Sequence, residues 1–360
     1  MEKIKRPVRE KLPAILDSIY FPVVSILASF LVAGLAMLAL GFDPLTAFGG
    51  LLSGSLGNLK AIAETLNKAT PVILTGISYA IAQKCGFVNL GAEGQLYIGA
   101  LCAVLAGTEI SLPAAVHIPV VLIAAFLGGA LYGLIPALMK VKFGSSELIT
   151  TIMFNYVALY FVHYMIAVPI KDYGSTSNFA QSKAMLESAQ LPRILTGTRL
   201  HAGIIVALLA LIAFQFILYH TTTGYEMRVI GMNRTAARCA GMNTGTKTLL
   251  SMFLAGGFAG LGGACELMGV QLRIMENAFN GFGFDGVAVA LLGNNSTVGT
   301  AFSGILFGAL KSGANKMTMK SGAPVAVIYM LQGLIILFVV GKRLFDYHRL
   351  GSKPAGRRKA

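Results

Sequence analysis

The sequence predicts an all-α fold, that of a polytopic membrane protein with about ten transmembrane helices, some of them broken or re-entrant. The 25 residues from Ser18 to Phe42 carry no charge, and a bilayer core about 30 Å thick needs roughly 20 apolar helical residues to cross it. Uncharged stretches of this kind return through most of the 360 residues. Hydrophobic residues make up 55% of the chain and charged residues only 12%, with a mean hydropathy of +0.71. These values exclude an ordinary soluble domain.

The net charge of +14 does not indicate a nucleic-acid partner. Its basic residues gather at the chain ends and between apolar stretches, which is the pattern of a membrane topology signal. The four cysteines are scattered, without a CxxC pair or a histidine at ligand spacing. We therefore expect neither a metal site nor a disulfide framework, and we interpret the cysteines as small packing residues.

Ten runs with little or no charge are expected to cross the membrane. They are residues 19–41, 69–84, 96–112, 115–139, 147–169, 201–220, 248–270, 286–298, 299–313 and 324–341. The uncharged stretch from Gly286 to Leu310 is interrupted at Gly293–Thr297. It therefore forms either two short spans or one broken helix.

The basic residues orient these spans through the positive-inside rule. An even count with both termini in the cytoplasm puts 19 of the 29 Lys and Arg residues on the cytoplasmic side. Residues 1–18 then form a cytoplasmic N-terminal segment, residues 19–341 a transmembrane domain and residues 342–360 a basic cytoplasmic tail. The same scheme places Lys311, Lys316 and Lys320 outside, against the rule.

Two connections differ from the spans. Residues 42–68 are amphipathic, with Lys60, Glu64 and Lys68 at helical spacing, and predict an interfacial helix whose charges pair on one exposed face. Residues 170–200 predict the one sizeable external loop.

The stretch Gly86–Gln95 joins three glycines, Asn89 and Glu93 between two short apolar runs. Irregular backbone at membrane depth persists only where protein or a watery cavity satisfies its polar groups, and an intramembrane carboxylate is a functional candidate. Glu93 either contacts a solute or supports the fold, by capping a neighbouring helix N-terminus or tying down the loop backbone.

A second stretch, Gly281–Gly293, repeats this pattern of glycine, aromatic residue, lone carboxylate and short apolar run. Paired interrupted segments in the two halves of a transporter point to a pathway between repeats. Aromatic rings and amide groups there could stack on a solute and bind it by hydrogen bonds, or could simply pack. The candidate pathway residues are Phe87, Asn89, Glu93, Gln95, Asn155, Phe282, Phe284 and Asp285.

The cytoplasmic loop 221–247 is the clearest interaction element. Ala236, Ala237 and Ala240 are helix formers followed by Gly241, which is suited to end a helix. A short helix lying in the cytoplasmic interface is therefore expected. A plain positively charged loop would explain the arginines but not the spacing of alanines and glycine.

Thr235–Gly241 resembles a degenerate EAA motif (Glu-Ala-Ala, three residues, Gly), by which permeases of ATP-binding-cassette (ABC) importers dock on their ATPase subunits. Thr235 occupies the position of the glutamate. The resemblance implies an ATPase-coupling role for Arg228, Gly231, Asn233, Arg234, Thr235, Ala236, Ala237, Arg238 and Gly241.

Three stretches extend the resemblance to roughly residues 20–341. Gly86–Gln95, Glu147–Tyr156 and Gly283–Gly293 together resemble the branched-chain amino acid and ribose type of ABC permease, closest to its nucleoside and simple-sugar members. This implies a multi-pass subunit of the bacterial cytoplasmic membrane. Its implied partners are two cytoplasmic ATPase subunits or domains, a second related permease in a heterodimer, an external substrate-binding lipoprotein and membrane lipid.

The function expected from this resemblance is import of nucleosides. ATP hydrolysis is assigned to a partner, and no catalytic residue, metal or cofactor is expected in this chain. Alternatives are a permease for simple sugars or branched-chain amino acids, or an ion-coupled secondary transporter in which Glu93 and Asp285 carry protons. A membrane-embedded enzyme is disfavoured, because no catalytic arrangement lies at one membrane depth.

Overall fold

The computed structural model describes residues 8–174, 179–279 and 281–351. The first helices are α1 (Val8–Ala39), α2 (Pro44–Ser55), α3 (Leu59–Lys84), α4 (Ala92–Glu109), α5 (Ala114–Phe143), α6 (Glu147–Ala167) and α7 (Gly203–His220). They are followed by α8 (Thr222–Met232), α9 (Arg234–Cys239), α10 (Thr244–Glu266), α11 (Phe282–Leu292), α12 (Thr297–Ser321) and α13 (Ala326–Gly351). Within the described ranges the only β-structure is three isolated bridges, so the all-α prediction is confirmed.

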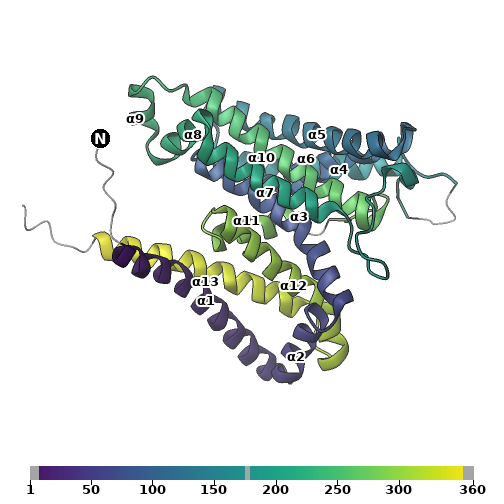
Figure 1. Ribbon diagram of the computed structural model, residues 1–360, viewed down its shortest axis with the longest axis horizontal. Helices are drawn as coiled ribbons and strands as arrows, with labels where there is room; N and C mark the ends of the chain where they lie inside the picture. The colour runs from purple at the N-terminus through teal and green to yellow at the C-terminus, as the bar shows by residue number, and fades with distance from the viewer. Residues whose placement is uncertain (1–7, 175–178, 280, 352–360) are drawn as a thin grey trace, which may run out of the picture. The chain divides into compact units, whose positions relative to one another are not determined.

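The chain forms two compact units. The larger one comprises residues 52–313, where α10 packs against α3, α4 and α5, and α11 packs against α3 (Figure 1). The smaller one comprises residues 1–51 and 314–360 and brings α1 against α13. The first seven residues and those after Gly351 lie outside the described residues.

Close helix packing in the larger unit depends on glycines of α10. A Cβ on Gly256 would lie 2.2 Å from the carbonyl oxygen of Gly129 in α5, and one on Gly260 would lie 2.3 Å from that of Ala125. Gly256 and Gly260 stand four residues apart and share one helix face. Small residues at this spacing let the backbones of membrane helices approach closely.

Four helices of the described part are long and apolar enough to cross a membrane. They are Ala114–Phe143, Glu147–Ala167, Gly203–His220 and Thr244–Gln271, which includes the π-helical turn Leu267–Gln271 after α10. Shorter apolar helices are Val23–Ala39, Phe282–Leu292 and Ala326–Val339. The chain is thus a multi-pass membrane protein by length and composition, while the count of ten spans stays a prediction.

The prediction of a separate helix over residues 42–68 is wrong. Helix α2 ends at Ser55, and Asn58 then caps a new helix by accepting a hydrogen bond from the Ala61 N–H at 2.8 Å. Residues 60–68 therefore form the first turns of α3, which continues to Lys84. Lys68 does not pair within this helix but reaches Glu266 of α10, at an Nζ–Oε1 distance of 3.1 Å.

The stretch from Gly286 to Leu310 divides between α11 and α12 at residues 293–296, which agrees with the expected interruption. The C-terminal ends of α12 and α13, by contrast, differ from those expected. Helix α12 continues to Ser321 and therefore contains Lys311, Lys316 and Lys320, which the orientation scheme left in an outside connection. Helix α13 likewise runs beyond residue 342 to Gly351, into the predicted basic tail.

Candidate functional site

Asn89 and Gln95 form a closed pair of side-chain amides inside the larger unit. The Asn89 Nδ2 donates to Gln95 Oε1 at 3.0 Å, and Gln95 Nε2 donates back to Asn89 Oδ1 at 3.1 Å. Asn89 Oδ1 also accepts the Gly91 N–H at 3.0 Å. Both residues are buried, as is Phe87 beside them in the chain. The two side-chain amides and the Gly91 N–H of the irregular segment between α3 and α4 thus find their hydrogen-bond partners within the protein.

Asn155 of α6 holds the same segment from the other side. Its Nδ2 donates to the Leu90 carbonyl at 2.8 Å, and its Oδ1 accepts the Gly94 N–H at 2.8 Å. Both polar atoms of this amide therefore bind backbone, and the contacts of Asn155 join α6 to the start of α4.

Glu93, in the first turn of α4, caps the start of α11. Its two carboxylate oxygens accept the backbone N–H groups of Gly281 at 3.0 Å and Gly283 at 2.5 Å. Those N–H groups have no partner within the helix, and a negative charge is favourable at a helix N-terminus. Of the two roles considered for Glu93, the contacts are those of the supporting one.

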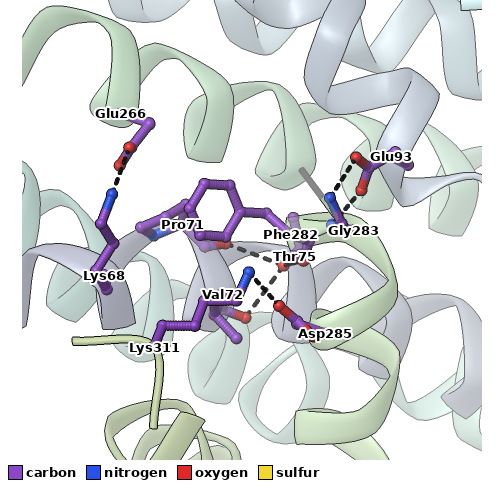
Figure 2. Close-up of polar contacts among 11 residues, drawn as sticks. Lys68, Pro71, Val72, Thr75, Glu93, Glu266, Phe282, Gly283, Asp285 and Lys311 are labelled. Carbon is purple, nitrogen blue, oxygen red and sulfur yellow. Dashed lines mark hydrogen bonds and ion pairs between the residues drawn. The ribbon is translucent and has the colours of Figure 1, made fainter. Parts of the chain in front are cut away.

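The first turn of α11 carries Phe282, whose ring has two lysine neighbours (Figure 2). Lys311 Nζ of α12 lies 4.1 Å from the ring centroid, and Lys68 Nζ of α3 lies 5.7 Å from it. Thr75 Oγ1 donates to the Phe282 carbonyl at 2.9 Å, which fixes the backbone of this turn against α3. The negative electrostatic potential of an aromatic face attracts nearby ammonium groups and stabilises them.

Each lysine also has a carboxylate partner. Lys311 Nζ lies 2.5 Å from Asp285 Oδ2, and Lys68 Nζ lies 3.1 Å from Glu266 Oε1. The side chains of Lys311 and Asp285 are 14% and 15% exposed. Phe282 and these two ion pairs, here called the Phe282 cluster, thus bring charges from α3, α10, α11 and α12 together within apolar sequence.

The structure divides the candidate pathway residues into two groups. Phe87, Asn89, Gln95 and Asn155 lie around the irregular segment, whereas Glu93, Phe282 and Asp285 meet at the start of α11. Phe284 belongs to neither group, since half of it is exposed. Sequence reasoning missed Lys68, Thr75, Glu266 and Lys311 as members of the cluster. Lone charges in long apolar stretches were the available signal for Glu266 and Lys311.

The connection 221–247, which the sequence places in the cytoplasm, consists mostly of helix. Thr221 accepts the Gly224 N–H at 3.0 Å and begins α8, and Asn233 accepts the Ala236 N–H at 3.0 Å and begins α9. Gly241 follows α9 with a φ of +78°, a left-handed conformation that glycine adopts readily. A short helix ended by Gly241 was expected around Ala236 and Ala237, and α9 is that helix; its location in the cytoplasmic interface stays a prediction, and α8 was not foreseen.

Most of α9 faces away from the protein. Thr235, Ala236 and Arg238 are exposed, and Ala237 is buried. Met232, at the end of α8, is 85% exposed. An exposed segment of this kind, with arginines and a solvent-exposed methionine, is suited to contact another protein.

Helix α8 is fixed to the body by three contacts. Lys247 Nζ of α10 lies 3.0 Å from Glu226 Oε2, and the Arg228 guanidinium lies 4.8 Å from the ring centroid of Tyr219. A Cβ on Gly231 would lie 2.3 Å from the Lys84 carbonyl oxygen, so the end of α8 touches the last turn of α3. That turn leads directly into the segment held by Asn89 and Gln95.

Metal binding has no candidate site in the described part of the chain, where no cluster of three His, Cys, Asp or Glu residues occurs. Cys85, Cys102, Cys239 and Cys265 are free thiols.

Comparison with known proteins identifies the family. The family model described as "branched-chain amino acid transport system / permease component" matches residues 61–340. The guanosine ABC transporter permease protein NupP of Bacillus subtilis is 39% identical over 90% of this chain and 93% of its own length. The glucose ABC transporter permease protein TsgB13 of Haloferax volcanii is 35% identical, over 92% and 89%. The nucleoside ABC transporter permease protein NupB of Lactococcus lactis is 33% identical, over 90% and 91%.

No solved structure matches the chain. The family match covers most of the sequence, and three curated permeases align with nearly the whole of it. The chain therefore belongs to the family of permease components of branched-chain amino acid-type ABC transport systems.

Proposed function

We propose that this chain is the transmembrane permease subunit of an ABC importer that translocates nucleosides. The observation that carries the substrate class is the similarity to NupP and NupB, named for guanosine and nucleoside transport and aligned over nine-tenths of this chain. TsgB13, named for glucose, is 35% identical, so simple sugars are the second candidate. Branched-chain amino acids are a third candidate substrate class, supported by the family description alone.

The proposed assembly contains four kinds of subunit. Two cytoplasmic ATPase subunits or domains hydrolyse ATP, and an external substrate-binding lipoprotein delivers the solute. A second, related permease completes the membrane part. A heterodimer is supported by the guanosine permease NupQ of Bacillus subtilis, which is 26% identical to this chain and comes from the same organism as NupP.

The proposed topology keeps both termini in the cytoplasm. Residues 19–341 form the transmembrane domain, with about ten spans and an interruption between α11 and α12. The connection 221–247 faces the cytoplasm, whereas residues 170–200 face outward. The location of Arg228, Arg234, Arg238 and Lys247 in one connection supports this orientation.

Transmission from the ATPase to the pathway would follow a continuous series of contacts. Helices α8 and α9 receive the movement, and Gly231 transmits it to the last turn of α3 at Lys84. The segment after this turn leads to Glu93, which holds the start of α11 and so the Phe282 cluster. Each contact in this series is short or hydrogen-bonded, so it can transmit displacement rather than absorb it.

Alternating access would then open the region around α11 outward and inward in turn. The pathway proposed here comprises the two groups of residues around Asn89 and Phe282, with Phe284 beside them. The secondary-transport alternative needs Glu93 and Asp285 to carry protons. The contacts of these two residues weaken this alternative, since Glu93 caps α11 with both carboxylate oxygens and Asp285 pairs with Lys311.

Uptake in cells tests the substrate class. Cells expressing this chain with its ATPase, second permease and receptor are expected to accumulate labelled guanosine, and an excess of other nucleosides should compete while glucose and leucine should not. Cells lacking only this chain provide the matched control. Competition by glucose or leucine, with none by nucleosides, would contradict the nucleoside assignment and favour one of the alternatives.

A further inference from the structure

The Lys68–Glu266 ion pair contains a carboxylate oxygen to which the proposed pathway assigns no role. Glu266, the last residue of α10, is 1% exposed. Its Oε1 accepts from Lys68 Nζ at 3.1 Å. Its Oε2 is also buried, and no hydrogen-bond donor among the described residues reaches it.

A buried carboxylate oxygen without a donor is costly. Leaving a buried charged acceptor unsatisfied forfeits the hydrogen bonds it made with water, and most such atoms in proteins have a protein or water partner. Ion pairs in apolar surroundings persist only when additional hydrogen bonds satisfy their remaining acceptors. Glu266 Oε2 is therefore an acceptor whose partner comes from outside the described residues, as a water molecule or a solute group.

The ion pair reaches the surface on its Lys68 side. The Lys68 side chain is 26% exposed, whereas that of Glu266 is 1% exposed. Figure 2 shows the two side chains pointing toward each other from α3 and α10, with the Phe282 ring nearby. The pair thus combines a solvent-reachable ammonium with an enclosed carboxylate.

The backbone around Glu266 is irregular on the side that follows it. Helix α10 changes into the π-helical turn Leu267–Gln271, and Leu272 then has a φ of +60°. Single π-helical turns are frequent at functional sites. The backbone at Arg199 also lies close to Lys68, because Nδ2 of the neighbouring Asn67 donates a hydrogen bond to the Arg199 carbonyl at 2.9 Å.

The depth of the pair corresponds to the outer mouth of the pathway in the proposed topology. Lys68 lies sixteen residues before Lys84, the cytoplasmic end of α3, which corresponds to about 24 Å along the helix. A bilayer core is about 30 Å thick. The pair therefore lies where an external receptor would release its solute.

We propose that Lys68 and Glu266 form a binding site for a neutral, hydroxyl-bearing solute, such as the ribosyl group of a nucleoside. Glu266 Oε2 accepts a hydrogen bond from a solute hydroxyl, and the Lys68 ammonium donates to a neighbouring solute oxygen. The pair has no net charge, so a charged solute would bring an uncompensated charge into an apolar region. This inference rests on the proposed function for its orientation and for the choice of a nucleoside.

Saturation-transfer NMR without the receptor tests this site, because it detects weak binding to the detergent-solubilised permease complex. Guanosine should receive saturation at its ribose protons from the native complex. Glu266→Gln, which turns one acceptor oxygen into a donor group, should weaken this binding about tenfold, the scale of one lost hydrogen bond to a charged group. The control Glu147→Gln removes the carboxylate of another ion pair, Lys140–Glu147, and should leave binding unchanged.

Deoxy analogues locate the hydroxyl. Among 2′-, 3′- and 5′-deoxyguanosine, at least one should bind the native complex about tenfold more weakly than guanosine, and should lose no further affinity in Glu266→Gln. The double variant Lys68→Met/Glu266→Gln removes both charges together, so it provides a second test if the single variant fails to fold. Equal binding by the native complex and both variants would overturn the proposal, as would absence of any solute signal. Glu266-dependent binding of hexoses but not nucleosides would support the site and contradict the nucleoside assignment.

Discussion

At the scale of single residues, Glu93 is the connection between the two irregular segments of the chain. It lies in the first turn of α4 and binds the N–H groups of Gly281 and Gly283, which are distant in sequence. Sequence reasoning identified Glu93 as a lone carboxylate and offered helix capping as one of two roles. It could not name the capped helix, because such a contact depends on how the segments pack rather than on spacing.

Replacement of Glu93 by alanine should destabilise the protein by about 3 kcal/mol, because two N–H groups lose a charged acceptor. Glu93→Gln keeps one acceptor oxygen and should cost less. The exposed Glu109, at the other end of α4, provides a matched control, and Glu109→Gln should change stability little. Thermal unfolding in detergent measures the difference. Equal unfolding temperatures for Glu93→Ala and the control would show that the cap does not stabilise α11.

Gly231 tests the contact between α8 and α3. A methyl group there would lie 2.3 Å from the Lys84 carbonyl oxygen, so Gly231→Ala must displace backbone and should cost about 1–3 kcal/mol. Gly49→Ala in α2 is the control, since nothing lies within 4 Å of its added Cβ, and it should be neutral or stabilising. Unfolding in detergent separates the two. If Gly231→Ala left the stability unchanged, α8 would be free to move away from α3.

At the scale of elements, α11 and α12 are joined by the Asp285–Lys311 ion pair. Asp285→Asn or Lys311→Met alone leaves a mostly buried charge and should destabilise by about 3 kcal/mol. Replacing both removes the uncompensated charge, so the double variant should be more stable than either single one. A double-mutant cycle of unfolding free energies measures this coupling. Additive effects would indicate that the two charges do not interact.

The helical pair α8–α9 is the proposed docking element for the ATPase. Reversing the charge of Arg234 and Arg238 to glutamate should reduce co-purification of the ATPase at least several-fold, while membrane insertion remains normal. Lys183→Glu alters an exposed lysine of the 170–200 connection instead and should leave co-purification unchanged. ATPase recovered at normal yield with both arginines reversed would count against the docking assignment.

At the scale of the whole molecule, the sequence predicted the all-α class and most helix positions, because long uncharged stretches have few alternatives to a helix in lipid. It was wrong to separate residues 59–68 from the span that follows, since they are the first turns of α3. From Ala69 to Ala82 every residue of α3 is buried by protein. An enclosed helix tolerates polar residues that lipid would exclude, so hydropathy alone could not recognise its full length.

The candidate site was predicted only in part for a related reason. Asn89, Gln95 and Asn155 stood out as polar residues in apolar sequence, yet they bind one another or backbone. Lys68 and Glu266 are separated by 198 residues, and a single sequence contains no signal that joins them. Polar residues at membrane depth were therefore found readily, whereas their partners required the packed structure.

Import by this permease depends, in the proposed function, on a separate ATPase. The direct measurement is uptake of labelled guanosine into vesicles containing this chain, its ATPase, second permease and receptor, with the energy source varied. Uptake should require ATP, stop with orthovanadate and be lost when the ATPase is left out. Uptake driven by a proton gradient in vesicles without any ATPase would contradict this dependence.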